Sequence, residues 1–328
     1  MIIRSVTCLY PGLQPRPFPF VSGICFIYDF SNSIIKKNEI SSLSSTIDSS
    51  IVSGILVYNN SNAGYDYIFN ANKIYDLAVT KAEARVAGIY SHLYEPLDPL
   101  GIRRITAYNN IIGDLRAPAS GNNTRPSIAG IYIENNTIND FIDIYHNTID
   151  IRATGSHPAF SSAALYADAQ AVVGSYANIF NNISTPGASG KTVAFWRRGT
   201  SLTSHSGDYN SLYAGTPAAN RLIYFDGTNS DQTLAAYKTR VGGTKEVSSV
   251  TELPVYVSTA GINTGFLHLD PNANCGLIGK AINFHAITEL GLDFDNDIRA
   301  NMFFPQHIGA DETAKTYTWT GANSTSWN

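Results

Sequence analysis

Two carboxylates and one arginine in the middle of the chain are of the types that polysaccharide chemistry needs. Glu134, Asp168 and Arg198 occupy the same place in three similar segments, Gly-Ile-Tyr-Ile-Glu, Ala-Leu-Tyr-Ala-Asp and Ala-Phe-Trp-Arg-Arg. Glycoside hydrolases act through two carboxyl groups roughly 5–10 Å apart, which neighbouring strands can provide. A lyase would need a base, and Arg198 is the candidate. The alternative is a solvated face of ion pairs with no catalytic role.

An aromatic residue stands two positions before each of these three side chains, and the same place is aromatic in two further segments. Sugar rings stack on flat aromatic strips, and the neighbouring polar side chains can bond sugar hydroxyls. The predicted ligand-binding column is Tyr90, Tyr132, Tyr166, Trp196 and Tyr224. Stacked aromatic rings also stabilise repeat proteins directly, so a purely structural column is the alternative.

Alternating carboxylates at Asp293, Asp295 and Asp297 suit a hard cation such as Ca²⁺. The EF-hand pattern is incomplete, because no Gly stands at the sixth position and no Glu at the twelfth. The alternative is a turn in which one aspartate pairs with Arg299. Apart from this calcium site, no cofactor is expected.

The histidines and cysteines suggest no further site. The seven histidines are scattered without metal-ligand spacing, and there is no Cys-x-x-Cys pair. A disulfide between Cys8 and Cys25 would leave Cys275 over, so three buried thiols are the expected state.

The elements that must position these residues are set by a recurring asparagine. It is followed by any residue and then Ile or Leu, and it returns after 34, 38, 37, 34 and 29 residues. The copies begin at Asn38, Asn72, Asn110, Asn147, Asn181 and Asn210. Each copy reads as a short strand beside a tight bend, and a period of this length indicates stacked repeats. We therefore expect these asparagines to stack at one corner of a solenoid of parallel strands.

A second set of strands runs in phase with the asparagines. Because strand side chains alternate between faces, one column is predicted to point inward and the next outward. The inward column is Ile55, Ile89, Ile131, Leu165, Phe195 and Ile223. The outward columns are Leu56 with the aromatic residues above, and then Tyr58, His92, Glu134, Asp168, Arg198 and Asp226. Alternation also sends Arg197 inward.

Bulk composition excludes several classes of protein. The chain has 328 residues, of which 44% are hydrophobic and 15% charged, so it is long enough to fold and too apolar for a disordered chain. Its net charge of −4 argues against nucleic acid or anionic lipid as a partner. No apolar run is long enough for a membrane span.

The sequence pattern changes after Gly227. Asp231 is the expected N-cap of a short helix that Gly242 ends. Further on come Asp293-Phe294-Asp295-Asn296-Asp297-Ile298-Arg299 and Ile308-Gly309-Ala310-Asp311-Glu312. With the repeats, this ending resembles secreted right-handed parallel β-helix proteins of Gram-negative bacteria. In that family Gly is usual at the place of Asn296 and Asp at the place of His307.

The tail carries a second resemblance. Residues 317–328, Tyr-Thr-Trp-Thr-Gly-Ala-Asn-Ser-Thr-Ser-Trp-Asn, are similar to the opening of a Trp-Thr-Gly β-module. Such modules follow parallel β-helices in surface proteins exported by type IX secretion. The resemblance implies one piece of a longer multi-domain chain.

The expected organisation is an all-β, right-handed parallel β-helix over residues 31–312, with loop insertions and a C-terminal cap. Residues 1–30 form an unclear segment or an improvised cap, and residues 313–328 a linker and the start of a second module. The expected function is a non-catalytic extracellular or cell-surface module that binds carbohydrate along the aromatic column. The alternatives are a polysaccharide lyase or glycoside hydrolase of the β-helix type, and a spacer or adhesin stalk.

Overall fold

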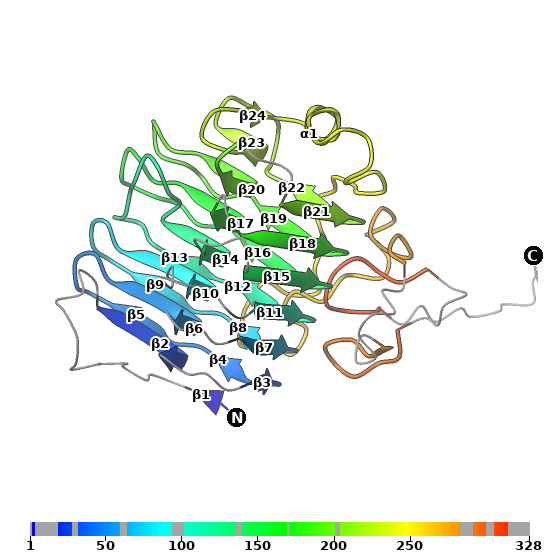
Figure 1. Cartoon of the computed structure of the whole chain (residues 1–328), viewed down its shortest axis with the longest axis horizontal. Helices are drawn as coiled ribbons and strands as arrows, with labels where there is room; N and C mark the ends of the chain where they lie inside the picture. The colour runs from blue at the N-terminus through cyan, green and yellow to red at the C-terminus, as the bar shows by residue number, and fades with distance from the viewer. Residues whose placement is uncertain are drawn as a thin grey trace, which may run out of the picture.

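The computed structural model describes residues 2–3, 19–27, 32–59, 64–93, 102–135, 140–168, 171–200, 204–282, 291–299 and 305–313. In this part of the chain nearly every element is a β-strand, and the strands stack into parallel sheets (Figure 1). The predicted all-β parallel β-helix is confirmed. Cys8 and residues 314–328, with the Trp-Thr-Gly resemblance, lie outside the described residues.

Four sheets form the walls of the solenoid. Sheet 1 contains β1 (Ile2–Ile3), β4 (Glu39–Ile40), β8 (Lys73–Ile74), β12 (Ile111–Gly113), β16 (Thr148–Ile151), β19 (Ile179–Asn182) and β22 (Ser211–Tyr213). Sheet 2 contains β2 (Phe20–Ile27), β6 (Ile51–Asn59), β10 (Arg85–Leu93), β14 (Ile128–Asn135), β17 (Ser162–Asp168), β20 (Thr192–Arg198), β23 (Arg221–Phe225) and β24 (Ser230–Asp231). Sheet 3 contains β3 (Ser33–Lys36), β7 (Tyr65–Asn70), β11 (Arg103–Tyr108), β15 (Asp140–Tyr145), β18 (Val172–Tyr176) and β21 (His205–Asp208). Sheet 4 contains β5 (Leu43–Ser45), β9 (Leu77–Val79) and β13 (Leu115–Arg116).

Each coil passes through sheet 3, then sheet 1, then sheet 2. The coils that contain β5, β9 and β13 add a short strand of sheet 4 before they enter sheet 2. β2 already pairs with β6 in parallel, so the stack begins before residue 31, within the segment that the sequence left as unclear or an improvised cap. All the parallel neighbours come from successive coils, as a solenoid requires.

The asparagine ladder occupies the corner between sheets 3 and 1. Its members are Asn38, Asn72, Asn110, Asn147, Asn178 and Asn210, in steps of 34, 38, 37, 31 and 32 residues. Each side-chain amide donates to the Oδ1 of the next coil's asparagine at 2.9–3.1 Å. The prediction of Asn181 for the fifth coil was wrong. Asn178 precedes Ile179 and Phe180, and the sequence pattern required Ile or Leu where Phe180 stands.

The two faces of sheet 2 follow the predicted alternation up to the last coil. The inward column joins the main core, and it pairs Ile89 with Ile131, Ile131 with Leu165 and Leu165 with Phe195. In the sixth coil the prediction was wrong by one residue. Tyr224 pairs with Phe195 inside, and Phe225 pairs with Trp196 outside. Arg197 is buried, as alternation predicts, and donates to the carbonyl of Ala171.

Helix α1 (Leu234–Val241) closes the far end of the stack. Its N-cap is Thr233, whose hydroxyl accepts from the N–H of Ala236, so the prediction of Asp231 as the cap was wrong. Asp231 instead accepts two hydrogen bonds from Arg240. Gly242 ends the helix with φ of 80°, as predicted. Tyr237 of α1 stacks on Tyr224 with ring centroids 4.6 Å apart, which covers the core of the last coil.

Val250 still pairs with Ser211 of β22, but the segment after it does not add coils. It runs back along the outside of sheet 1, where Phe266 and Leu267 pack on Tyr75 and Ile111, and it reaches the earliest coils. In Figure 1 its orange part lies beside the carboxyl ends of the sheet 3 strands. The turn with Asp293 therefore lies beside early coils, and the expectation of a cap at the end of the stack was wrong for this segment.

Candidate functional site

The column expected to bind sugars is assembled but buried. Tyr90 and Trp196 are 2% exposed, and Tyr132, Tyr166 and Tyr224 are fully buried. The rings of Tyr132 and Tyr166 lie 4.4 Å apart, as in a stacked column. Tyr224 belongs to the inner core instead. The prediction of an exposed strip was therefore wrong, and these rings are closed to a glycan.

The outward residues of sheet 2 form an apolar cluster of their own. Phe20, Leu222 and Phe225 pack with the outward aromatic residues in this cluster, which is separate from the main core. Arg85 lies over the ring of Tyr132, with 5.9 Å between its guanidinium carbon and the ring centroid. Alternation tells which side of a sheet a residue faces, but not whether other side chains cover that side.

The predicted catalytic group is also assembled. The register of β14, β17 and β20 places Glu134, Asp168 and Arg198 on neighbouring strands in one column. Glu134 is only 6% exposed and accepts hydrogen bonds from the hydroxyl of Tyr90 and the guanidinium of Arg125. Each carboxylate thus lies beside positive or hydrogen-bonding partners and is closed to a polymeric substrate.

The electrostatics of the two carboxyl groups differ. Burial tends to raise the pKa of Glu134, but the hydrogen bond and charge of His92 and the charge of Arg125 outweigh it and lower the pKa to about 2. Burial raises the pKa of Asp168, which Arg198 offsets in part from 3.5 Å. Two carboxyl groups whose pKa values differ in this way are seen in catalytic acid–base pairs. Here the difference follows from the unequal number of cationic partners beside Glu134 and Asp168.

The predicted calcium ligands are used differently. Asp293 Oδ1 accepts from the main-chain N–H groups of Asp295 at 2.9 Å and Asp297 at 2.8 Å, which closes the turn. Asn296 has φ of 75°, the left-handed conformation for which Gly is usual. Arg299 bonds the carboxylate of Glu312 at 2.7 Å and not one of the three aspartates. The Oδ1 atom of Asp293 is therefore engaged by the turn itself.

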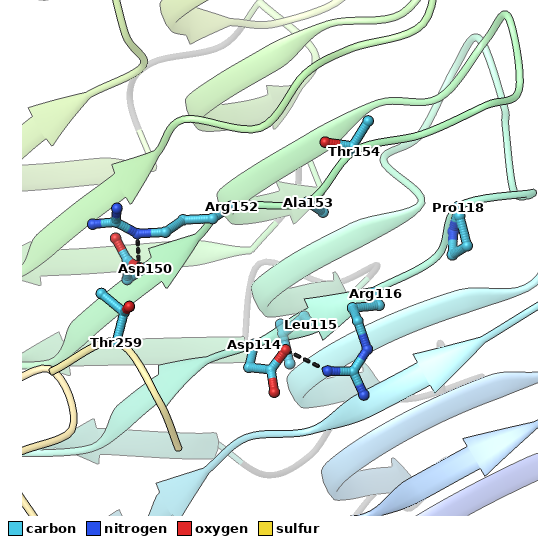
Figure 2. A pocket seen from close by; sticks show the side chains of 9 residues that line it. All are labelled: Asp114, Leu115, Arg116, Pro118, Asp150, Arg152, Ala153, Thr154 and Thr259. Atoms are coloured by element: carbon cyan, nitrogen blue, oxygen red, sulfur yellow. Dashed lines mark hydrogen bonds and ion pairs between the residues drawn. The ribbon is translucent and has the colours of Figure 1, made fainter. Parts of the chain in front are cut away.

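One open site of the described residues lies elsewhere, in a groove where sheets 1 and 4 meet the returning C-terminal segment. We call it the charged groove; its volume is about 270 Å³. Its lining residues are Asp114, Leu115, Arg116, Pro118, Asp150, Arg152, Ala153, Thr154 and Thr259. Figure 2 shows the two aspartate–arginine pairs on the coils and Thr259 on the C-terminal segment.

Local structure fixes both pairs. Asp114 occupies the left-handed bend between β12 and β13, with φ of 49°, and Arg116 ends β13. Arg116 bonds both Asp114 and Asp76, the bend residue of the previous coil. Arg152 Nε donates to Asp150 Oδ2 at 2.6 Å as the chain leaves β16. These bonds to aspartates hold the guanidinium groups of Arg116 and Arg152 in place.

Three of the four charged side chains of the groove are partly exposed. Those of Arg116, Arg152 and Asp114 are 46%, 38% and 34% exposed, whereas that of Asp150 is 4% exposed. Burial raises the pKa of Asp150, and the hydrogen bonds from Arg152 and Asn181 offset this in part. Arg152 also lies over the ring of Tyr256, 5.9 Å from its centroid. A ligand would meet guanidinium donors and threonine hydroxyls.

A sequence signal for this groove exists. Asp-x-Arg occurs twice in successive coils, as Asp114-Leu115-Arg116 and Asp150-Ile151-Arg152. The two copies are out of register, because Asp150 pairs with Gly113. Thr259 also lines the groove, but it belongs to a segment that is remote in sequence, and no repeat pattern predicts its position.

The fold and the groove define a class, a parallel β-helix with an open, charged site on its flank. No family model, curated protein or solved structure matches the chain. The described residues contain no helix of the length and apolarity needed to cross a membrane.

Proposed function

We propose that this protein is a non-catalytic, extracellular or cell-surface β-helix module that binds an acidic polysaccharide in the charged groove. The observation that carries the proposal is the pair of partly exposed guanidinium groups, Arg116 and Arg152, on one cavity. The extracellular setting rests on the resemblance of the C-terminal sequence to secreted β-helix proteins, including those exported by type IX secretion.

The chemistry of the groove favours an acidic sugar. Guanidinium groups bond carboxylates with two parallel N–H donors, and Thr154 and Thr259 can bond sugar hydroxyls. The cavity is slightly smaller than the roughly 300–1,000 Å³ of drug-sized pockets, so it suits a short stretch of a polymer. Net charge is −4, so attraction would come from contact with the groove and not from a long-range field.

Binding accounts for the groove better than catalysis. A general acid or base must exchange its proton with the substrate. Asp150 already accepts from Arg152 and Asn181, and Asp114 accepts from Arg116. Their role is to hold the arginines in place.

The test is calorimetric titration with acidic and neutral oligosaccharides of equal length. We expect the acidic series to bind, with affinity rising with length as more contacts form. Arg152→Gln removes a charged donor worth about 1.5–3 kcal/mol, so affinity should fall roughly 10–100-fold. Arg104→Gln is the matched control, since Arg104 is 42% exposed on sheet 3. Equal binding by Arg152→Gln, or by the neutral series, contradicts the proposal.

A rigid spacer or adhesin stalk is the second candidate. It is favoured by the continuous asparagine ladder, whose bonds link every coil from Asn38 to Asn210. The absence of binding to any acidic or neutral glycan would favour the spacer. Turnover that Glu134→Gln or Asp168→Asn abolishes would instead favour a lyase or hydrolase.

A further inference from the structure

Three potential metal ligands meet in the C-terminal segment, outside the charged groove. One ligand atom each from His268, Asp295 and Asp311 lie within 4.8 Å of one another. His268 Nε2 is 3.2 Å from Asp295 Oδ2. The residues come from three stretches, near Leu267, in the Asp293 turn and after Gly309, so the cluster joins parts of the segment that are distant in sequence.

The histidine supplies an independent indication of a ligand. Its Nε2 atom is enclosed and makes no hydrogen bond, although Asp295 is near, because the carboxylate lies off the direction of a ring N–H. A buried nitrogen left in this way costs free energy unless something completes its coordination. A metal ion bound to the lone pair of the neutral imidazole would do so.

Among the described residues no arginine or lysine forms an ion pair with either carboxylate, and the charged neighbour of Asp295 is His268 itself. Asp311 is 6% exposed. Burial raises the pKa of Asp311 and of Asp295, and the charge of His268 offsets this in part. Arg299 is engaged by Glu312 and Asn109. Two carboxylates beside one enclosed imidazole form an electron-rich site.

The surroundings hold these ligands in place. The main-chain N–H of Leu269 donates to Asp311 Oδ2 at 3.1 Å, an outer contact of the kind that orients metal ligands. Asp293 closes the turn that presents Asp295. Asp295 is 44% exposed, so it can move the roughly 1 Å that ligand bonds of about 2.0–2.2 Å require.

We propose that His268, Asp295 and Asp311 bind one divalent transition-metal ion, with Zn²⁺ as the best match and water completing its coordination. One imidazole nitrogen and two carboxylate oxygens suit Zn²⁺, whereas Ca²⁺ takes oxygen ligands only. The ion would tie three stretches of the C-terminal segment to one another.

Metal-stripped protein, titrated with Zn²⁺, Ca²⁺ and Mg²⁺ in a calorimeter and in thermal melts, tests the site. We expect one Zn²⁺ per chain and a rise in Tm, because an ion bound only to the native state stabilises it. Ca²⁺ and Mg²⁺ should give neither effect. Co²⁺ bound in place of Zn²⁺ should give the visible absorption of a low-coordinate site.

Variants separate the site from adventitious surface binding. Asp295→Asn alters an exposed side chain, and His268→Gln keeps a polar group; each should weaken Zn²⁺ binding by more than the roughly 10–100-fold of an outer-contact loss. Asp297→Asn, in the same turn and also exposed, should bind Zn²⁺ like the wild type. Unchanged binding in His268→Gln, no Zn²⁺ binding at all, or stabilisation by Ca²⁺ alone would overturn the proposal; a protonated His268 between two aspartates would then explain the cluster.

Discussion

Single side chains in this solenoid perform several bonding tasks at once, and asparagine is the main example. The Oδ1 of Asn110 accepts from both the main-chain N–H and the side-chain amide of Asn72, while its own amide donates to Phe69 O and to Asn147. Asp offers no amide donor and Leu neither a donor nor an acceptor. This double duty explains why asparagine returns at the corner, since buried polar groups need complete bonding.

The ladder also requires an ending. At the last coil, Asn210 has no further asparagine to bond within its row. Ser249 accepts from its main-chain N–H at 2.9 Å, and Glu246 accepts from its side-chain amide at 3.1 Å. Ser249 and Glu246 thus provide the acceptors that the asparagine of a further coil would otherwise provide.

Glu134 makes a prediction about pH at the residue scale. Its pKa of about 2 in the folded protein lies below its ordinary value of 4.5. A lowered pKa means that the carboxylate stabilises the fold fully above its ordinary value, and that this contribution is lost as pH falls toward 2. Glu134→Gln should therefore destabilise the protein at pH 7. The stability gap to wild type should narrow by roughly 2–3 kcal/mol as pH falls toward 2.

Urea unfolding of both proteins at several pH values measures this gap. Asp66→Asn, which removes a carboxylate at an exposed position of β7, serves as the control. A constant gap for Glu134→Gln from pH 7 to pH 3 would contradict the prediction.

At the scale of strands, a row of glycines explains how sheet 2 meets sheet 1. Gly54, Gly88 and Gly130 follow one another in the stack, and a Cβ on Gly88 would lie 2.4 Å from Ile112 Cγ2 and 2.7 Å from Gly130 O. The row continues as Ala164 and then Ala194, where sheet 1 carries Phe180 and Leu212 in place of the β-branched isoleucines. Glycine is needed where the facing side chain branches at Cβ.

Gly88→Ala should therefore destabilise the protein, since an added methyl group in a packed core costs typically 1–3 kcal/mol. Chemical denaturation at neutral pH provides the measurement. Gly291→Ala is the matched control, because no atom lies within 4 Å of its added Cβ. An unchanged unfolding midpoint for Gly88→Ala would contradict the prediction, because sheets 1 and 2 could then move apart at Gly88 without loss of stability.

Much of the strand arrangement could be predicted from the sequence, because a period of stacked repeats specifies both neighbours and register. The pairing of Ile89 with Ile131 and of Glu134 with Asp168 follows from it. The predicted register was wrong where the repeat pattern is weaker, in the coils that contain Phe180 and Tyr224. The exposure of the aromatic residues could not be predicted, since burial depends on loops and side chains that obey no repeat.

The site was less predictable than the fold. The sequence indicates the Asp-x-Arg copies but gives no reason to place Thr259 beside them. The charged groove and the His268 cluster both depend on the returning C-terminal segment, whose path is set by long-range contacts. Those contacts involve single residues such as Arg299 and Asn109, which carry no periodic signal.

The whole molecule therefore consists of a stack of coils and a long segment held against its flank. Apolar packing on sheet 1 and several hydrogen bonds attach the segment. Arg299, 1% exposed, bonds Asn109 of the stack and Glu312 of the segment, and Gly309 N donates to Ala177 O at 2.8 Å. The stack itself is held by its own ladders, so the segment and the stack should differ in local stability.

Arg299→Ala tests this division. Removing one partner of a buried ion pair costs typically 3–5 kcal/mol, because Glu312 is left buried without its counter-charge. We expect the loss to fall on the segment. In hydrogen exchange, the amides of Ile308 and Gly309 should lose protection while those of Ile89 and Ile131 keep it. Arg104→Ala, a partly exposed pair on sheet 3, should change neither group. If protection falls equally across stack and segment, the two form one cooperative unit, and neither the charged groove nor the His268 cluster can open independently of the coils.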